Sequence, residues 1–167
     1  NCGNAIGLSV NTDNNCTATT TGTTLDASQS QPGCSGTADD DVWYSFIATA
    51  ATHRIDVIAA ATGGIQSPVM ELFAGNCSAL SSIICSAQTS FTTNVAVINS
   101  LTIGTTYFVR VYSSSPALNA QGTFTICIKT PSIPLNDNCT GAINLTVNTG
   151  INCTSITNGT TSDATQS

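Results

Sequence analysis

Three adjacent carboxylates, Asp39, Asp40 and Asp41, precede an apolar run in the segment "TADDDVWYSF". Adjacent carboxylates repel one another unless a cation or water screens them, and calcium takes about 6 to 8 oxygen ligands. Alternate residues of a strand point to the same side, so Asp39 and Asp41 share a side. We therefore predict a calcium site at Asp39 and Asp41, with a solvated acidic turn as the alternative. A second oxygen-rich position is the "NDN" around Asp137.

Groups that could support catalysis are few. A serine or cysteine nucleophile requires a base, and His53 is the only histidine. Glu71 could pair with an aspartate as in glycoside hydrolysis, but nothing in the sequence brings two such carboxylates together. We expect Glu71 to be a solvated side chain on a strand. The GxSxG, HExxH and glycine-rich phosphate-loop patterns are missing from the sequence, which therefore predicts no catalytic residues, no organic cofactor and no enzyme activity.

Cysteine is the next chemically distinctive residue type. The eight cysteines are Cys2, Cys16, Cys34, Cys77, Cys85, Cys127, Cys139 and Cys153. Their wide spacing and the single histidine argue against a zinc site. An even number of cysteines at recurring spacings indicates a disulfide framework, which persists in oxidising compartments. We therefore expect a secreted, extracellular protein at the cell surface.

The start of the chain recurs near its end. A shift of 137 positions aligns residues 1–30 with residues 138–167 without a gap, and 19 of the 30 pairs are identical. This predicts tandem repeats of about 137 residues, a normal size for one domain. We expect residues 1–130 to form one complete repeat, residues 131–137 a linker, and residues 138–167 the N-terminal strands of the next repeat. Isolated strands are marginal in water, so these strands should pack on the first unit or add to a neighbouring chain as a donor segment.

The repeat also suggests how the cysteines pair. Two cysteines that are oxidised within the short second copy must join each other, and the repeat carries this pair over to the first copy. Another two flank a hairpin-like segment, and the last pair follows by elimination, although four cysteines allow three connectivities and these stay open. The expected pairs are Cys139–Cys153, Cys2–Cys16, Cys77–Cys85 and Cys34–Cys127.

Short β-branched and aromatic runs, separated by turn residues, predict strands along the first unit. The expected strands cover residues 5–10, 16–24, 41–50, 53–60, 68–74, 80–86, 94–101, 106–113 and 122–129. Alternation places Tyr44, Phe46, Val109 and Ile126 on faces that point to a core. The predicted class is all-β, a two-sheet Greek-key or jelly-roll-like sandwich. Trp43 is expected at the core or its edge rather than as a platform for sugar stacking.

Charge limits the partners. Only 7% of the residues are charged, the net charge is -6, and the basic residues are Arg54, Arg110 and Lys129. Three cations cannot neutralise a phosphate backbone, and an anionic membrane would repel the chain. We therefore expect no nucleic-acid partner. We also expect no membrane insertion, because no stretch approaches the roughly 20 apolar residues of a span.

Four segments together resemble a known family. The segments "DDDVWYSFIATA", "PVMELFAGNCSAL", "LTIGTTYFVRVYS" and "GTFTICI" are similar to the pre-peptidase C-terminal-like sandwich repeats of secreted Bacteroidota-type surface proteins. The resemblance implies a jelly-roll-like sandwich without an active site, in long exported proteins attributed to adhesion, gliding or attachment to polymers. We expect a structural repeat of an extracellular filament or adhesin stalk whose partners are copies of itself. The alternative is an accessory module that binds protein or carbohydrate, such as a surface polysaccharide.

Overall fold

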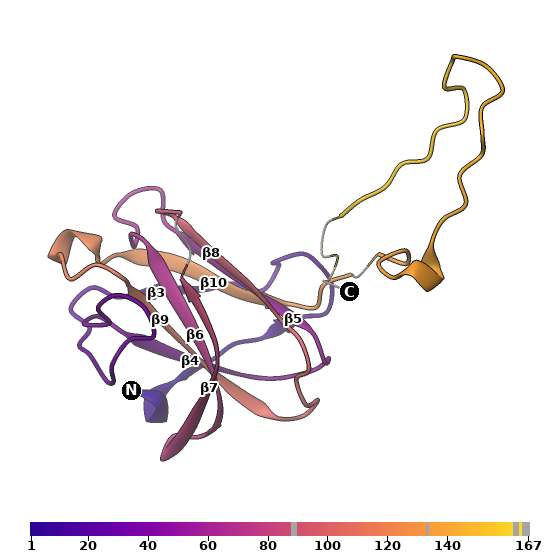
Figure 1. Ribbon diagram of the computed structural model, residues 1–167. Helices are drawn as coiled ribbons and strands as arrows, with labels where there is room; N and C mark the ends of the chain where they lie inside the picture. Colours follow the sequence, from indigo (N-terminus) through magenta and orange to yellow (C-terminus); the bar gives the residue numbers. More distant parts are fainter. Residues whose placement is uncertain (88–89, 133, 162–163, 165–167) are drawn as a thin grey trace. The chain divides into compact units, whose positions relative to one another are not determined.

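The computed structural model describes residues 1–87, 90–132, 134–161 and 164. The chain forms two units, Asn1–Thr130 and Pro131–Ser167. The first unit contains all ten strands of the described residues, arranged in two sheets (Figure 1). The predicted all-β, two-sheet sandwich is confirmed, and the helical content of the described residues consists of three short 3-10 turns.

The first sheet, sheet A, has the strand order β1-β4-β9-β6-β7. Its strands are β1 (Ile6–Gly7), β4 (Val42–Ile47), β9 (Thr106–Ser113), β6 (Pro68–Asn76) and β7 (Ala79–Ala87). The two-residue β1 runs parallel to β4, and the other neighbours are antiparallel. Sheet A is therefore a mixed sheet whose edge beside β4 is only partly filled.

The second sheet, sheet B, has the order β2-β10-β5-β8, and β3 also pairs with β10. Its strands are β2 (Val10–Asn11), β3 (Thr20–Thr23), β5 (His53–Ala59), β8 (Thr93–Ile98) and β10 (Thr123–Lys129). Short β2 pairs in parallel with the end of β10, and β3 pairs antiparallel with its beginning. The predicted run 5–10 is thus two strands that belong to different sheets, because the chain crosses from one sheet to the other at Leu8.

The core lies between the facing sheets. Tyr44 and Phe46 of β4, Val109 of β9 and Ile126 of β10 are buried in one apolar cluster, which confirms the alternation expected from the sequence. At roughly 25 cal/mol for each Å² of apolar surface removed from water, such burial is the main force that holds the sheets together.

A third layer covers the outer face of sheet A. The segment 25–41 passes over this face, where Trp43 and Phe73 lie with their ring centroids 5.3 Å apart beside buried Cys2. Tyr112 packs beside Ala38 of the covering segment, and its hydroxyl donates to the carbonyl of Ser35. Both faces of sheet A are therefore buried over much of their length, which explains why β6 reads as a nearly continuous apolar run.

The disulfides join distant segments and correct the expected pairing. The bonds are Cys2–Cys77, Cys16–Cys127 and Cys34–Cys85, and Cys139 and Cys153 are free and exposed. The six predicted disulfide cysteines of the first unit are confirmed as such, but each predicted pair, Cys2–Cys16, Cys77–Cys85, Cys34–Cys127 and Cys139–Cys153, is wrong.

The strand order gives the reason. Cys2 lies beside sheet A and Cys16 is bonded to β10 of sheet B, because the crossing at Leu8 separates them. In the β6–β7 hairpin the residue opposite Cys85 is Glu71, whereas Cys77 lies in the turn. Short sequence separation was therefore the wrong guide to proximity.

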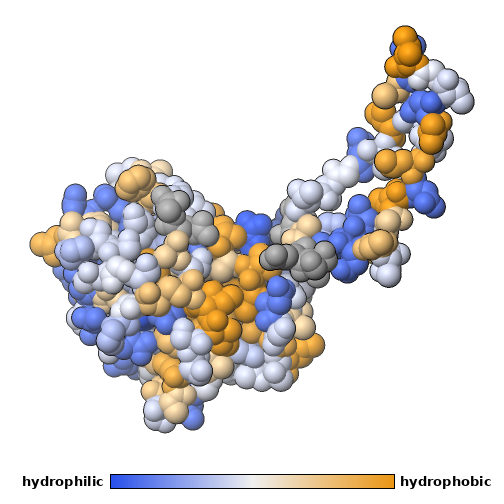
Figure 2. Space-filling view, viewed as in Figure 1, coloured by the Kyte–Doolittle hydropathy of each residue, from blue (hydrophilic) through white to orange (hydrophobic). Residues whose placement is uncertain are grey.

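The second unit contains no strand among its described residues, and its one 3-10 turn is Cys139–Gly141. Its apolar side chains are exposed, Leu145 at 72% and Val147 at 86%, and Figure 2 shows apolar residues along this segment. Their counterparts 137 positions earlier, Leu8 and Val10, pack at the sandwich core. The second unit thus has the side chains of a sandwich segment without the sheets that would bury them.

Candidate functional site

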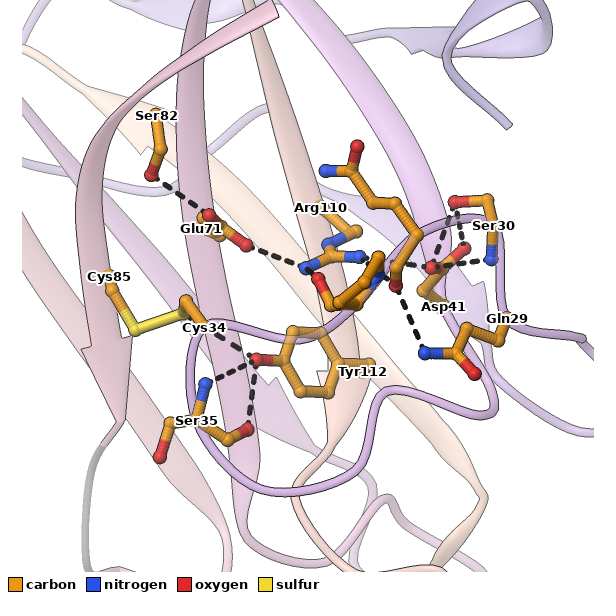
Figure 3. Close-up of polar contacts among 12 residues, drawn as sticks. Gln29, Ser30, Cys34, Ser35, Asp41, Glu71, Ser82, Cys85, Arg110 and Tyr112 are labelled. Carbon is orange, nitrogen blue, oxygen red and sulfur yellow. Dashed lines mark hydrogen bonds and ion pairs between the residues drawn. A yellow bond between two sulfur atoms is a disulfide. The ribbon is translucent and has the colours of Figure 1, made fainter.

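The strongest concentration of charged side chains surrounds Arg110, under the covering segment. Strand alternation turns Arg110 of β9 and Glu71 of β6 to the outer face of sheet A, where the register places them opposite each other. Asp41 immediately precedes β4, and the side chains of Arg110 and Asp41 are both 0% exposed. Figure 3 shows the guanidinium between the two carboxylates.

The guanidinium is held by four oxygens. Nη2 of Arg110 lies 2.6 Å from Oε2 of Glu71 and 2.8 Å from the carbonyl oxygen of Pro32. Nη1 lies 3.2 Å from Oδ2 of Asp41 and 2.8 Å from the carbonyl oxygen of Gln31. Arg110 thus ties segment 25–41 to the sheet with charge-assisted hydrogen bonds, which are stronger than neutral ones.

Aromatic rings complete this environment. The guanidinium carbon of Arg110 lies 5.0 Å from the ring centroid of Tyr112 and 5.8 Å from that of Trp43. Burial raises the pKa of the Tyr112 hydroxyl, which also bonds to Ser35. Trp43 is buried and donates from Nε1 to the Ser30 hydroxyl at 2.9 Å, in agreement with the expected core position rather than a sugar platform.

Asp41 is fully engaged by protein groups. Its carboxylate accepts hydrogen bonds from the amide and hydroxyl of Ser30, from Nε1 of Trp43 and from Arg110. Glu71 is likewise buried, and accepts from Ser82 at 2.8 Å as well as from Arg110. The expectation of a solvated Glu71 is wrong: the strand turns this residue under the covering segment, where Arg110 compensates its charge.

The other two acidic residues of the triplet have oxygens without partners. Asp40 is 0% exposed and Oδ1 accepts from the amide of Ser113 at 2.9 Å, but Oδ2 has no hydrogen-bond partner. Burial raises the pKa of the Asp40 carboxyl, more than hydrogen bonds from Ser113 and Thr24 lower it. Oδ1 of half-buried Asp39 also lacks a partner. Calcium binding at Asp39 and Asp41 stays a prediction, and the carboxylate oxygens that lack a hydrogen-bond partner here belong to Asp39 and Asp40.

Among the described residues, three side chains of metal-ligating types lie close together in one place, Cys16, Asp56 and Cys127. Its two sulfurs are bonded to each other, so neither is available as a thiolate ligand. Asp56 is paired with Arg54 at 2.7 Å and with Lys129 at 3.0 Å. This group is therefore an ion-pair cluster beside a disulfide.

The only histidine of the sequence has a structural role. His53 is 0% exposed, and its Nε2 accepts hydrogen bonds from the amides of Thr49 and Ala50 at 3.1 and 3.2 Å. Burial lowers the pKa of His53, in spite of an opposing hydrogen bond with the backbone of Lys129. The imidazole is thus a neutral acceptor that closes the turn between β4 and β5, with its acceptor nitrogen already used.

A groove of about 450 Å³ opens between strands β3 and β4. Its lining includes the polar residues Asn1, Asn4, Thr21 and Thr23, the acidic Asp41 and the aromatic Trp43. Polar side chains around an apolar surface suit a polar ligand such as a sugar or an extended peptide, and the one acidic lining residue, Asp41, is paired with Arg110. The prediction of sites from the sequence missed this groove, because its walls come from segments that approach only in the sandwich.

All three basic residues of the chain lie in ion pairs: Arg54 and Lys129 with Asp56, and Arg110 with Asp41 and Glu71. These contacts leave an acidic excess on the rest of the protein. Among the described residues no helix has the length and apolar character needed to cross a membrane.

Comparison with known proteins gives likeness to solved structures only at the level of the fold. No family model matches the chain, and no curated protein matches it. Among solved structures, the chain is similar to the pre-peptidase C-terminal domain of a collagenase from Bacillus anthracis. The sequence identity is 19%, the match covers 75% of this chain and 94% of that domain, and the TM-score is 0.46.

Proposed function

We propose that this chain is a structural unit of an extracellular stalk or filament, in which sandwiches follow one another and function resides in length and stability. The observation that carries the proposal is the recurrence of the first segment of the sandwich, with 19 of 30 residues identical, in a second unit that has no sheet among its described residues. A segment with core-type residues such as Leu145 exposed is stable only when another sandwich buries them.

The internal chemistry supports this proposal. Three disulfides join segments that are 51 to 111 residues apart, as suits a protein exposed to an oxidising medium. The groups that resemble catalytic ones, His53, Glu71 and Asp41, are used to hold loops on sheets. Together they favour a rigid extracellular module over an enzyme.

Electron microscopy tests the proposed function. We expect negative-stain images of the protein isolated from its native source to contain fibres or stalks with a regular axial repeat. Dispersed particles without extended connections would overturn the structural role.

The groove between β3 and β4 favours a second candidate, a module that binds carbohydrate or extended peptide. Isothermal titration with neutral oligosaccharides tests it, and binding should weaken when Thr21→Trp narrows the groove. Thr12→Trp is the control, because Thr12 is exposed and does not line the groove. Absence of binding across a panel of neutral oligosaccharides and extended peptides would exclude this role.

A further inference from the structure

Residues 1–24 fill a defined slot on the sandwich. They contribute β1 beside β4 and both β2 and β3 beside β10, and two disulfides fasten them, Cys2 to Cys77 and Cys16 to Cys127. This slot is defined by the edges of β4 and β10 and by the two receiving cysteines. Any other segment that fits it must reproduce both strand pairings and both sulfur positions.

The second unit retains the residues that contact the slot. Fifteen of the 24 residues in 138–161 are identical to residues 1–24, and nine differ. The buried residues of the first segment are all retained, and they are Cys2, Leu8, Asn11 and Thr24, with counterparts Cys139, Leu145, Asn148 and Thr161. Eight of the nine differing positions are exposed in the first unit, and position 14 is half-buried. The pattern of identity therefore follows contact with the sandwich.

Glycine gives an independent sign. A side chain at Gly22 would collide with the Tyr44 hydroxyl and meet the Phe124 ring at 2.7 Å, whereas the space around Gly7 is open. In the second unit Gly22 is retained as Gly159, whereas Gly7 is replaced by Asn144. A Cβ at Gly159 would meet nothing within 4 Å beyond its chain neighbours in the second unit, and the φ of Gly159 is not in the left-handed region. Gly159 thus has no local reason to be a glycine, but a docked segment requires one.

The second unit also has the local shape of the first segment. In the first unit the amide oxygen of Asn11 accepts from Thr17 and Ala18, and its Nδ2 donates to the carbonyl of Ala18. Asn148 makes the same bonds with the corresponding residues Thr154 and Ser155. The additional bond from Nδ2 of Asn11 to the carbonyl of Ile128 on β10 is made across the slot.

We infer that residues 138–161 are a docking segment for the slot that residues 1–24 fill, on the sandwich of a second copy of this chain. In this register Leu145 and Val147 take the places of Leu8 and Val10 in the core. The segment is preorganised by the Asn148 loop, which lowers the entropy cost of binding. The inference rests on the proposed function, because it names the contact by which one unit would hold the next.

The docked segment would be held by two disulfides, Cys139 to Cys77 and Cys153 to Cys127. Thiol–disulfide exchange forms them without an oxidant: the Cys139 thiolate attacks Sγ of Cys77, and the Cys2 thiolate leaves and takes up a proton. Both cysteines of the second unit are free and exposed, as such an attack requires.

Cross-linking in a loosened full chain tests the inference. The variant Cys2→Ser, Cys16→Ser, Gly22→Val weakens the chain's own segment and leaves Cys77 and Cys127 as thiols. With oxidised glutathione, which is reduced to two glutathione thiols for each bond formed, we expect disulfide-linked oligomers. Peptide mapping should find Cys139–Cys77 and Cys153–Cys127. Absent or differently paired cross-links would overturn the inference.

Matched glycine variants separate docking from random oxidation. In the same background, Gly159→Val should lower the yield of oligomer about tenfold or more, because its side chain would collide in the slot. Gly150→Val should leave the yield unchanged, because its counterpart Asp13 is exposed. Equal yields from the two variants would also count against docking.

A chimera keeps the test independent of the loosened variant. Replacing residues 1–24 by the sequence of residues 138–161 introduces nine substitutions, and we expect the same three disulfides and a melting temperature close to that of the original protein. Misfolding or altered pairing of the chimera would contradict the inference. Dispersed particles in native material would contradict the filament alone, so the two failures are distinguishable.

Discussion

At the scale of single residues, Arg110 dominates the interior chemistry. Arg110→Met would leave the carboxylates of Asp41 and Glu71 buried without their cation, and breaking a buried ion pair costs roughly 3 to 5 kcal/mol. We expect urea unfolding to report a loss of this size. The control is Arg54→Met, whose side chain is 27% exposed and whose loss should cost at most about 1 kcal/mol. Equal losses in the two variants would show that burial of the Arg110 ion pairs adds nothing to the free energy of unfolding.

Asp40 is a residue whose charge opposes folding. Its folded-state pKa is raised above 3.8 by burial, so the folded protein binds the proton more tightly than the unfolded chain. The penalty is present above the folded pKa and disappears as the pH falls below 3.8. Asp40→Asn retains the oxygen that accepts from Ser113, and should therefore raise the melting temperature at pH 7 but not at pH 3.

Calcium provides the counter-test for the same residue. If the acidic triplet binds an ion through Asp39 and Asp40, calcium should stabilise the original protein and leave Asp40→Asn unaffected. A rise in melting temperature from Asp40→Asn at pH 7 that calcium does not alter would mean that no ion compensates the unpartnered carboxylate oxygen of Asp40, which then lowers the stability of the fold. No gain in the absence of calcium would contradict the assignment of Asp40 as a charge that opposes folding.

His53 acts in the opposite direction on pH dependence. Its folded-state pKa lies below the ordinary 6.5, so the unfolded chain binds more protons as the pH falls through this range. The stability from neutral His53 is complete above pH 6.5 and declines toward the folded pKa. Melting curves between pH 7 and pH 5 should show a loss that His53→Gln reduces. An identical pH profile in the variant would refute the role of His53.

At the scale of elements, the positions of the strands could be predicted from the sequence, but the partners of those strands and of their side chains could not. The run 106–113 is strand β9 as expected, because its alternating β-branched and aromatic residues indicate both the extended conformation and the face that is buried. The run 5–10 hides a change of sheet at Leu8, which depends on which strands lie beside it. The predicted pair Cys2–Cys16 and the predicted exposure of Glu71 were wrong for the same reason. The partners of Cys2 and Glu71 are set by strand order and register, which the local sequence does not specify.

Glycine contacts on β3 offer a test at this scale. Gly22→Val places a side chain against Tyr44 and Phe124 and should destabilise the sandwich by roughly 1 to 3 kcal/mol, as overpacking does. Gly7→Val enters open space in β1 and should change the unfolding free energy little. Similar effects of the two variants on chemical denaturation would mean that β3 does not pack closely on β4 and β10.

At the scale of the whole molecule, the two copies of the segment differ in their surroundings. In the first unit the segment bridges both sheets and is fastened at each by a disulfide. In the second unit the local Asn148 loop persists among exposed apolar residues. Local sequence therefore determines the loop, while the sheets determine the strands, in line with the marginal stability of isolated strand pairs.

Thiol counting distinguishes this view from a self-contained second unit. Cys2 and Cys16, the counterparts of Cys139 and Cys153, are bonded to Cys77 beside sheet A and to Cys127 of sheet B. Because these two positions belong to different sheets, Cys139 and Cys153 should not join each other. A thiol reagent such as 5,5′-dithiobis(2-nitrobenzoate) should therefore titrate both in the folded 167-residue chain, and no further thiols after unfolding without reductant. The control is Cys139→Ser, which should lower the count by one. A count of zero would mean that Cys139 and Cys153 pair locally, and the segment would then lack the free sulfurs that docking requires.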